Sequence, residues 1–120
     1  MTMTLLIYIL LGFIAFEHLY FLYLEMFLWT TKKGIKAFGL KSKEFAEDTK
    51  VLAANQGLYN GFLAAGIIYA LLNNNMNFAV FFLTCVSIAG IYGAYSTKKI
   101  TLFYIQAVPA IMTLILVLLT

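Results

Sequence analysis

The sequence predicts an all-α membrane protein, built as a bundle of four transmembrane helices. Of its 120 residues, 63% are hydrophobic and 11% are charged, whereas soluble domains are about 45–50% apolar and about 25% charged. Four apolar stretches each reach the roughly 20 residues that a helix needs to cross the hydrocarbon core. None of them alternates polar and apolar residues with a period of two, which argues against a transmembrane barrel. Helices are then the remaining way to pair backbone groups in lipid.

The four stretches define one domain that covers residues 1–120. We expect the spans at about residues 5–30, 51–72, 78–96 and 100–119, with a loop at about 31–50. Within that loop Gly39 is a predicted helix stop and Ser42 a predicted N-cap. The helix that starts near Ser42 should continue into the second span. A short polar turn at residues 73–77 joins the second and third spans.

The basic residues predict the orientation of the bundle. All eight are lysines, and all fall between the first and second spans or between the third and fourth: Lys32, Lys33, Lys36, Lys41, Lys43, Lys50, Lys98 and Lys99. Cytoplasmic connections carry an excess of positive charge. Both basic connections are therefore expected in the cytoplasm and both termini outside.

Three ionisable residues interrupt the first span, and they are the candidate catalytic residues: Glu17, His18 and Glu25. A charge at the centre of a bilayer costs about 2.5–3.5 kcal/mol or more, so each needs a partner, a proton or water. At 3.6 residues per turn, His18 and Glu25 lie about 20° apart, while Glu17 points about 80–100° to one side. Alternatively, Lys50 reaches Glu25 and makes it part of a structural ion pair.

Polar residues of the other spans complete a predicted pocket that opens toward the cytoplasm. In the fourth span Pro109 lacks an N–H, so it should leave the carbonyl of Ile105 without a donor and bend the helix beside Gln106. The predicted ligand-binding residues are His18, Glu25, Asn55, Gln56, Tyr59, Asn60, Tyr92 and Gln106. The alternative for single polar residues such as Asn55, Thr84 and Ser87 is a hydrogen bond between helices, worth about 0.6 kcal/mol.

Small residues predict close helix approach on two faces, Gly57/Gly61 and Gly90/Gly93. Either face can also pair with a second copy of the chain. The single cysteine, Cys85, excludes an internal disulfide, and with a single histidine we expect no metal site. We further expect no cofactor and no nucleic-acid partner.

Several segments together resemble a known family. They are residues 17–29 (EHLYFLYLEMFLW), residues 50–62 (KVLAANQGLYNGF), residues 89–93 (AGIYG) and the pair Gln106 and Pro109. In these segments the chain is similar to small bacterial membrane proteins called the domain of unknown function 1304 family. The resemblance implies a multi-pass protein of the bacterial inner membrane. It adds no reaction, because the family has no established activity.

Three functions remain open at this point. In the first, the pocket binds, and in one version processes, a small amphiphilic or lipid-like molecule, with His18 exchanging protons with Glu17 or Glu25. In the second, the protein exports small cations or drugs in exchange for protons at Glu17. In the third, the bundle is a non-catalytic subunit of a membrane assembly. Membrane lipids are expected neighbours in all three, and whether the protein is an enzyme stays open.

Overall fold

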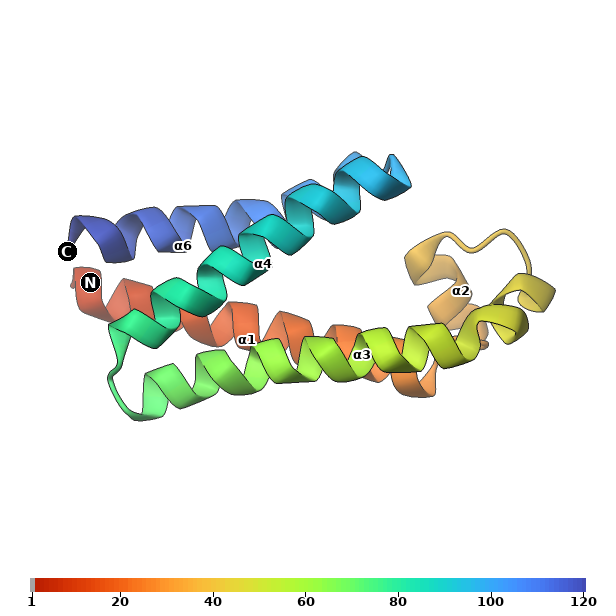
Figure 1. The fold of residues 1–120 in the computed structure, drawn as a ribbon, viewed down its shortest axis with the longest axis horizontal. Coiled ribbons are helices and arrows are strands. Elements are labelled where there is room, and N and C mark those ends of the chain that lie inside the picture. The colour runs from red at the N-terminus through yellow and green to blue at the C-terminus, as the bar shows by residue number, and fades with distance from the viewer. Residues whose placement is uncertain (1) are drawn as a thin grey trace. The chain divides into compact units, whose positions relative to one another are not determined.

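The chain is almost entirely helical. The computed structural model describes residues 2–120, and no strand occurs among them. The helices are α1 (Met3–Phe27), α2 (Lys32–Phe38), α3 (Lys43–Leu72), α4 (Met76–Thr97), α5 (Ile100–Leu102), the π-helical segment η1 (Phe103–Ala107) and α6 (Val108–Leu119) (Figure 1). Four helical runs are long and apolar enough to cross a membrane: Met3–Phe27, Lys43–Leu72, Met76–Thr97 and Ile100–Leu119. The predicted fold class is confirmed.

The polar segment between the first two long helices contains more structure than a loop. Gly39 ends α2 in the left-handed region at φ 61°, a conformation that glycine adopts without strain. The Oγ of Ser42 accepts a hydrogen bond from the Phe45 N–H at 3.0 Å, just where α3 begins. Both predicted helix boundaries are therefore confirmed. The short helix α2 lies inside the segment that was expected as a loop.

The chain forms two compact units. We call Glu17–Phe62 the hairpin unit, because the end of α1 and the first part of α3 run in opposite directions in it and the segment that contains α2 connects them. We call the remainder the terminal unit: the residues up to Phe16 together with Leu63–Thr120.

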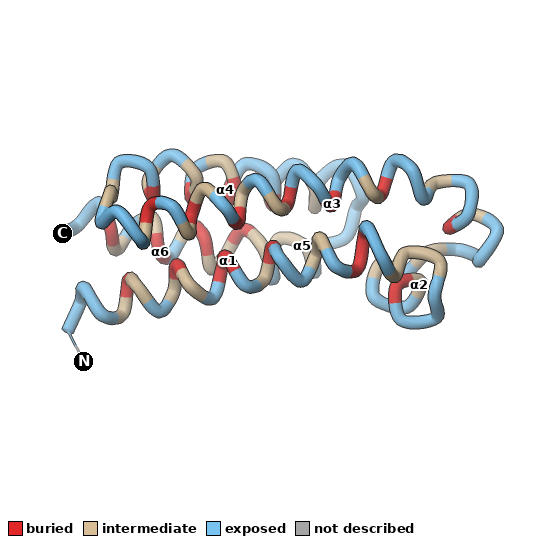
Figure 2. Tube along the Cα trace, turned by 90° about the horizontal axis from the view of Figure 1, so that it is seen from below, coloured by how far each residue is buried: buried red, intermediate tan, exposed pale blue. Residues whose placement is uncertain are grey.

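The terminal unit has an aliphatic core to which its long helices contribute. Its fully buried large side chains are Leu11, Ile14, Ile67, Leu83 and Val86, and Figure 2 shows buried positions recurring along α1, α3, α4 and α6. Helices α4 and α6 lie side by side (Figure 1). The Tyr8 hydroxyl donates to Asn74 Oδ1, which ties the start of α1 to the turn between α3 and α4.

The last span departs from α-helical geometry directly before Pro109, whereas the predicted bend of the helix stays a prediction. The segment η1 ends directly before α6, and the Val108 N–H donates to the Phe103 carbonyl, five residues back. A π-helical turn of this kind places one extra residue in the ladder next to the proline, which has no N–H to give. Gln106 lies in this turn.

Gly90 sets the closest approach of α4 to η1. A Cβ at this position would lie 2.7 Å from the Ala107 backbone nitrogen and 2.9 Å from its Cβ. A backbone atom cannot move aside as a flexible side chain can. The two elements therefore pack at this distance only because residue 90 has no side chain.

A pair of glycine substitutions tests this packing. We expect Gly90→Ala to destabilise the protein by about 1–3 kcal/mol through overpacking. Gly12→Ala, where nothing lies within 4 Å of the added Cβ, should instead stabilise it by about 0.5–1 kcal/mol through helix propensity. Thermal unfolding in detergent measures both, and an unchanged midpoint for Gly90→Ala would contradict the assigned contact.

Candidate functional site

The hairpin unit brings a buried carboxyl group and a buried amide together. Glu25 on α1 and Asn60 on α3 are each 6% exposed. Asn60 Nδ2 donates a hydrogen bond to Glu25 Oε1 at 2.5 Å. A carboxylate accepts such bonds strongly, so the contact stabilises the pairing of the two helices. Two members of the predicted site therefore meet.

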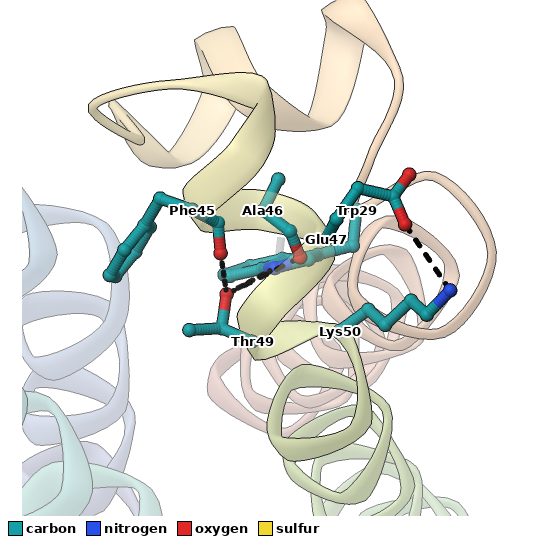
Figure 3. Close-up of polar contacts among 6 residues, drawn as sticks. All are labelled: Trp29, Phe45, Ala46, Glu47, Thr49 and Lys50. Atoms are coloured by element: carbon teal, nitrogen blue, oxygen red, sulfur yellow. Dashed lines mark hydrogen bonds and ion pairs between the residues drawn. The ribbon is translucent and has the colours of Figure 1, made fainter.

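Lys50 is not the partner of Glu25. Its Nζ lies 3.2 Å from Glu47 Oε2, an exposed ion pair within α3 (Figure 3). The alternative of a Lys50–Glu25 ion pair is therefore not what the structure shows. Exposed pairs of this kind contribute about 0–1 kcal/mol, so the Lys50–Glu47 contact adds little to the stability of the unit.

The predicted glycine face of α3 makes the Glu25–Asn60 contact possible. A Cβ on Gly57 would lie 2.7 Å from Met26 Cγ and 3.1 Å from Glu25 Cβ, and one on Gly61 would lie 2.6 Å from Leu22 Cδ1. Small residues at this spacing allow two helix backbones to approach closely. The Gly57/Gly61 face is thus occupied by α1 of the same chain.

Glu17 and His18 lie two turns earlier on α1 than Glu25. His18 is fully buried, and its ring packs edge-on against Phe21 at a centroid distance of 5.2 Å. Glu17 is half-buried, and its Oε1 is covered but has no hydrogen-bond partner within residues 2–120. Covering such an oxygen without a donor costs about 1–3 kcal/mol. Glu17 is therefore the group of this site whose hydrogen-bonding demand is unmet.

Other predicted site residues lie elsewhere. Asn55, Gln56 and Tyr59 are exposed, so the polar arc of α3 does not gather around Glu25 as Asn60 does. Tyr92, also exposed, and the half-buried Gln106 belong to the terminal unit. Their part in ligand binding stays a prediction.

Three threonine and serine hydroxyl groups of the terminal unit donate to carbonyls of their own helices. Thr84 donates to the Val80 carbonyl, Ser87 to Leu83 and Thr113 to Pro109, each at 2.7 Å. Each of these hydrogen bonds joins a residue to the carbonyl four residues earlier in the same helix, so none of them joins two helices. The predicted alternative of a hydrogen bond between helices is therefore wrong for Thr84 and Ser87, whose hydroxyl groups donate within α4.

Sequence reasoning missed a polar contact at the other end of the hairpin unit. The Trp29 Nε1 donates to Thr49 Oγ1 at 3.0 Å, and Thr49 in turn donates to the Phe45 carbonyl at 2.7 Å (Figure 3). The Trp29 ring also packs on Phe38 of α2, with centroids 4.9 Å apart. A partly buried indole N–H usually has an acceptor. That rule predicts an acceptor for the Trp29 indole but does not identify the acceptor as Thr49.

The chain is similar to known proteins over most of its length. Residues 12–118 match the model of a family described as "Protein of unknown function (DUF1304)". The chain belongs to the DUF1304 family. This DUF1304 protein is also 33% identical, over 100 residues, to "Uncharacterized protein YpaA" of Lactococcus lactis subsp. lactis (strain IL1403), covering 81% of this chain and 84% of the relative. No solved structure matches it. The resemblance seen in the sequence is confirmed.

A double-mutant cycle tests the Glu25–Asn60 contact of the DUF1304 protein. Asn60→Leu should destabilise it by about 1–3 kcal/mol, because the buried Glu25 carboxyl group loses its donor. Glu25→Met combined with Asn60→Leu should cost less than the sum of the two single changes. Glu25→Gln, which keeps an acceptor oxygen, is the control and should cost less than Glu25→Met. Additive effects in thermal unfolding would rule out the contact.

Proposed function

We propose that the DUF1304 protein is a multi-pass protein of the bacterial inner membrane, with both termini outside. The four long apolar helices support insertion. Every lysine lies between α1 and α3, in the first eight residues of α3, or between α4 and α5, and all of these positions would then lie on the cytoplasmic side, as the positive-inside rule requires. Exposed aliphatic and aromatic side chains on all four helices also suit contact with lipid.

Cysteine labelling tests the orientation. In a Cys85→Ala background, Asn77→Cys marks the start of α4, directly after the turn that joins it to α3, and Lys36→Cys marks α2; both positions are exposed. A membrane-impermeant maleimide added to intact cells should label Asn77→Cys. It should label Lys36→Cys only after permeabilisation. The reverse pattern would show that the proposed orientation is wrong.

We further propose that the protein binds a small amphiphilic molecule whose head group donates a hydrogen bond to Glu17. The observation that carries this proposal is the covered Glu17 Oε1 without a donor. Buried polar atoms are almost always hydrogen-bonded, and an exception calls for an explanation such as a missing ligand. An ammonium or hydroxyl group would supply the donor, and an apolar tail would suit the surrounding hydrocarbon.

The neighbouring polar residues support an assignment of separate roles. Glu25 already accepts a hydrogen bond from Asn60, so this pair holds α1 against α3. His18 follows Glu17 directly and is fully buried; the two imidazole nitrogens allow a histidine to serve as donor and as acceptor. In this proposal Glu17 contacts the ligand and His18 exchanges a proton.

The same oxygen favours a second function, proton-coupled export of small cations. A carboxyl group without a fixed partner can bind a proton and a cation in turn, as such a transporter requires. The two functions differ in what they need from Glu17. Binding needs an acceptor oxygen, whereas coupling needs a group that takes up and releases a proton.

Three variants distinguish ligand binding at Glu17 from proton coupling. Glu17→Met removes the acceptor at similar volume, Glu17→Gln keeps an acceptor but cannot ionise, and Glu44→Gln makes the same charge change at an exposed position of α3. Each protein is purified gently from native membranes, and mass spectrometry identifies the small molecules that it retains. We expect one amphiphile to be retained by the wild type and by Glu44→Gln, partly by Glu17→Gln, and at least tenfold less by Glu17→Met.

Equal retention by the wild type and Glu17→Met would contradict the proposed ligand site. Efflux of ethidium from vesicles with an imposed pH gradient tests the second function. Export predicts activity that Glu17→Gln abolishes, whereas ligand binding alone predicts no efflux above that of protein-free vesicles.

A further inference from the structure

An open groove of about 420 Å³ lies in the terminal unit, where α4 gives way to α5 and η1. Apolar and aromatic side chains and one cation line it: Ile91, Ala94, Tyr95, Lys98, Ile100 and Phe103. This composition fits a molecule with an apolar chain and one anionic group.

Lys98 has no acidic side chain to pair with inside its own unit. Every aspartate and glutamate of the chain lies in the hairpin unit: Glu17, Glu25, Glu44, Glu47 and Asp48. The terminal unit of a second copy would offer no carboxylate side chain either. Charge complementarity therefore favours an anionic occupant over a second terminal unit in this groove.

Lys98 has a backbone conformation that residues with a side chain rarely adopt. Lys98 caps α4 in the left-handed region at φ 58°, and its N–H donates to the Ala94 carbonyl. Glycine is the usual residue at such caps, because residues with a Cβ are strained in this conformation. The helix dipole favours a cation at this end, and the groove gives the lysine stem an apolar wall to follow.

The position of the groove at the end of α4 also suits binding of a lipid. Lys98 stands at the end of a helix suited to crossing a membrane, and Ile91 lies seven residues inside it, about 10 Å along the axis. In the orientation proposed above, the lysine is at the cytoplasmic interface and the apolar wall runs into the bilayer.

We propose that this groove binds one anionic phospholipid of the cytoplasmic leaflet. The Lys98 ammonium group contacts the lipid phosphate, and the first part of an acyl chain lies against Ile91, Ala94 and Phe103. The proposal rests on the membrane insertion and orientation proposed above, but it does not depend on ligand binding at Glu17.

Native mass spectrometry of the full chain in neutral detergent tests the site, with palmitoyl-oleoyl phosphatidylglycerol as the probe and the phosphatidylcholine of the same chains as the neutral comparison. Neutral detergent removes the general attraction of an anionic membrane surface. Lys98→Gly removes the ammonium group and relieves the strained cap, so the thermal midpoint should stay equal or rise. Retention of phosphatidylglycerol should nevertheless fall about fivefold.

Three further variants complete the test. Lys99→Gln makes the same charge change at the next residue, outside the groove lining, and should lower retention less than twofold. Ala94→Phe fills the groove without changing charge and should lower retention of phosphatidylglycerol. Glu44→Gln, at an exposed position outside both proposed sites, should leave it unchanged. Because none of these variants alters Glu17, failure here is distinguishable from failure of the ligand site at Glu17.

Three results would each overturn the proposal. Equal losses for Lys98→Gly and Lys99→Gln would indicate general surface attraction. Equal retention of the two lipids by the wild type would remove the role of the anionic head group. A dimer in the wild-type spectra that Ala94→Phe abolishes, with lipid retention unchanged, would make the groove an interface between copies of the chain.

Discussion

A buried polar group must find its hydrogen-bond partner within the chain when the surroundings are apolar, and this constraint organises the molecule. Ser87 and Thr113 meet it by donating to carbonyls of their own helices. Glu25 meets it through Asn60 of a neighbouring helix. The Oε1 of Glu17 does not meet it among the described residues. The proposed ligand site therefore follows from the same requirement that explains the rest of the polar interior.

Packing of the helices also requires that their backbones approach closely, and in both units glycine allows this approach. Gly57 brings α3 against Met26 and Glu25 in the hairpin unit, while Gly90 brings α4 against Ala107 in the terminal unit. Without a hydrophobic force between helices in lipid, such contacts supply much of the packing energy. The Glu25–Asn60 hydrogen bond depends on this spacing, because larger side chains would hold the two helices apart.

The sequence was sufficient to predict the four long helices and the cap at Gly39, because apolar length and local backbone preference determine them. It also predicted close helix approach at the Gly57/Gly61 face, where α1 packs. It could not pair Glu25 with Asn60, since helical angles order residues around one axis and leave the register against another helix undetermined. For the same reason Gln56, exposed in the structure, was grouped with Asn60. The Trp29–Thr49 contact also depends on how α2 folds back, which no local pattern sets.

The central claim is that an outside molecule supplies the hydrogen-bond donor that Glu17 Oε1 lacks among residues 2–120, while Glu25 already has a donor in Asn60. Carbon-13 NMR of the glutamate carboxyl groups, in lipid nanodiscs and with single-residue assignments, tests it most directly. On addition of a lipid extract from the native membrane, the account predicts that the Glu17 carboxyl resonance shifts and the Glu25 resonance stays in place. A Glu17 resonance that does not move, or one that moves together with that of Glu25, would contradict the account.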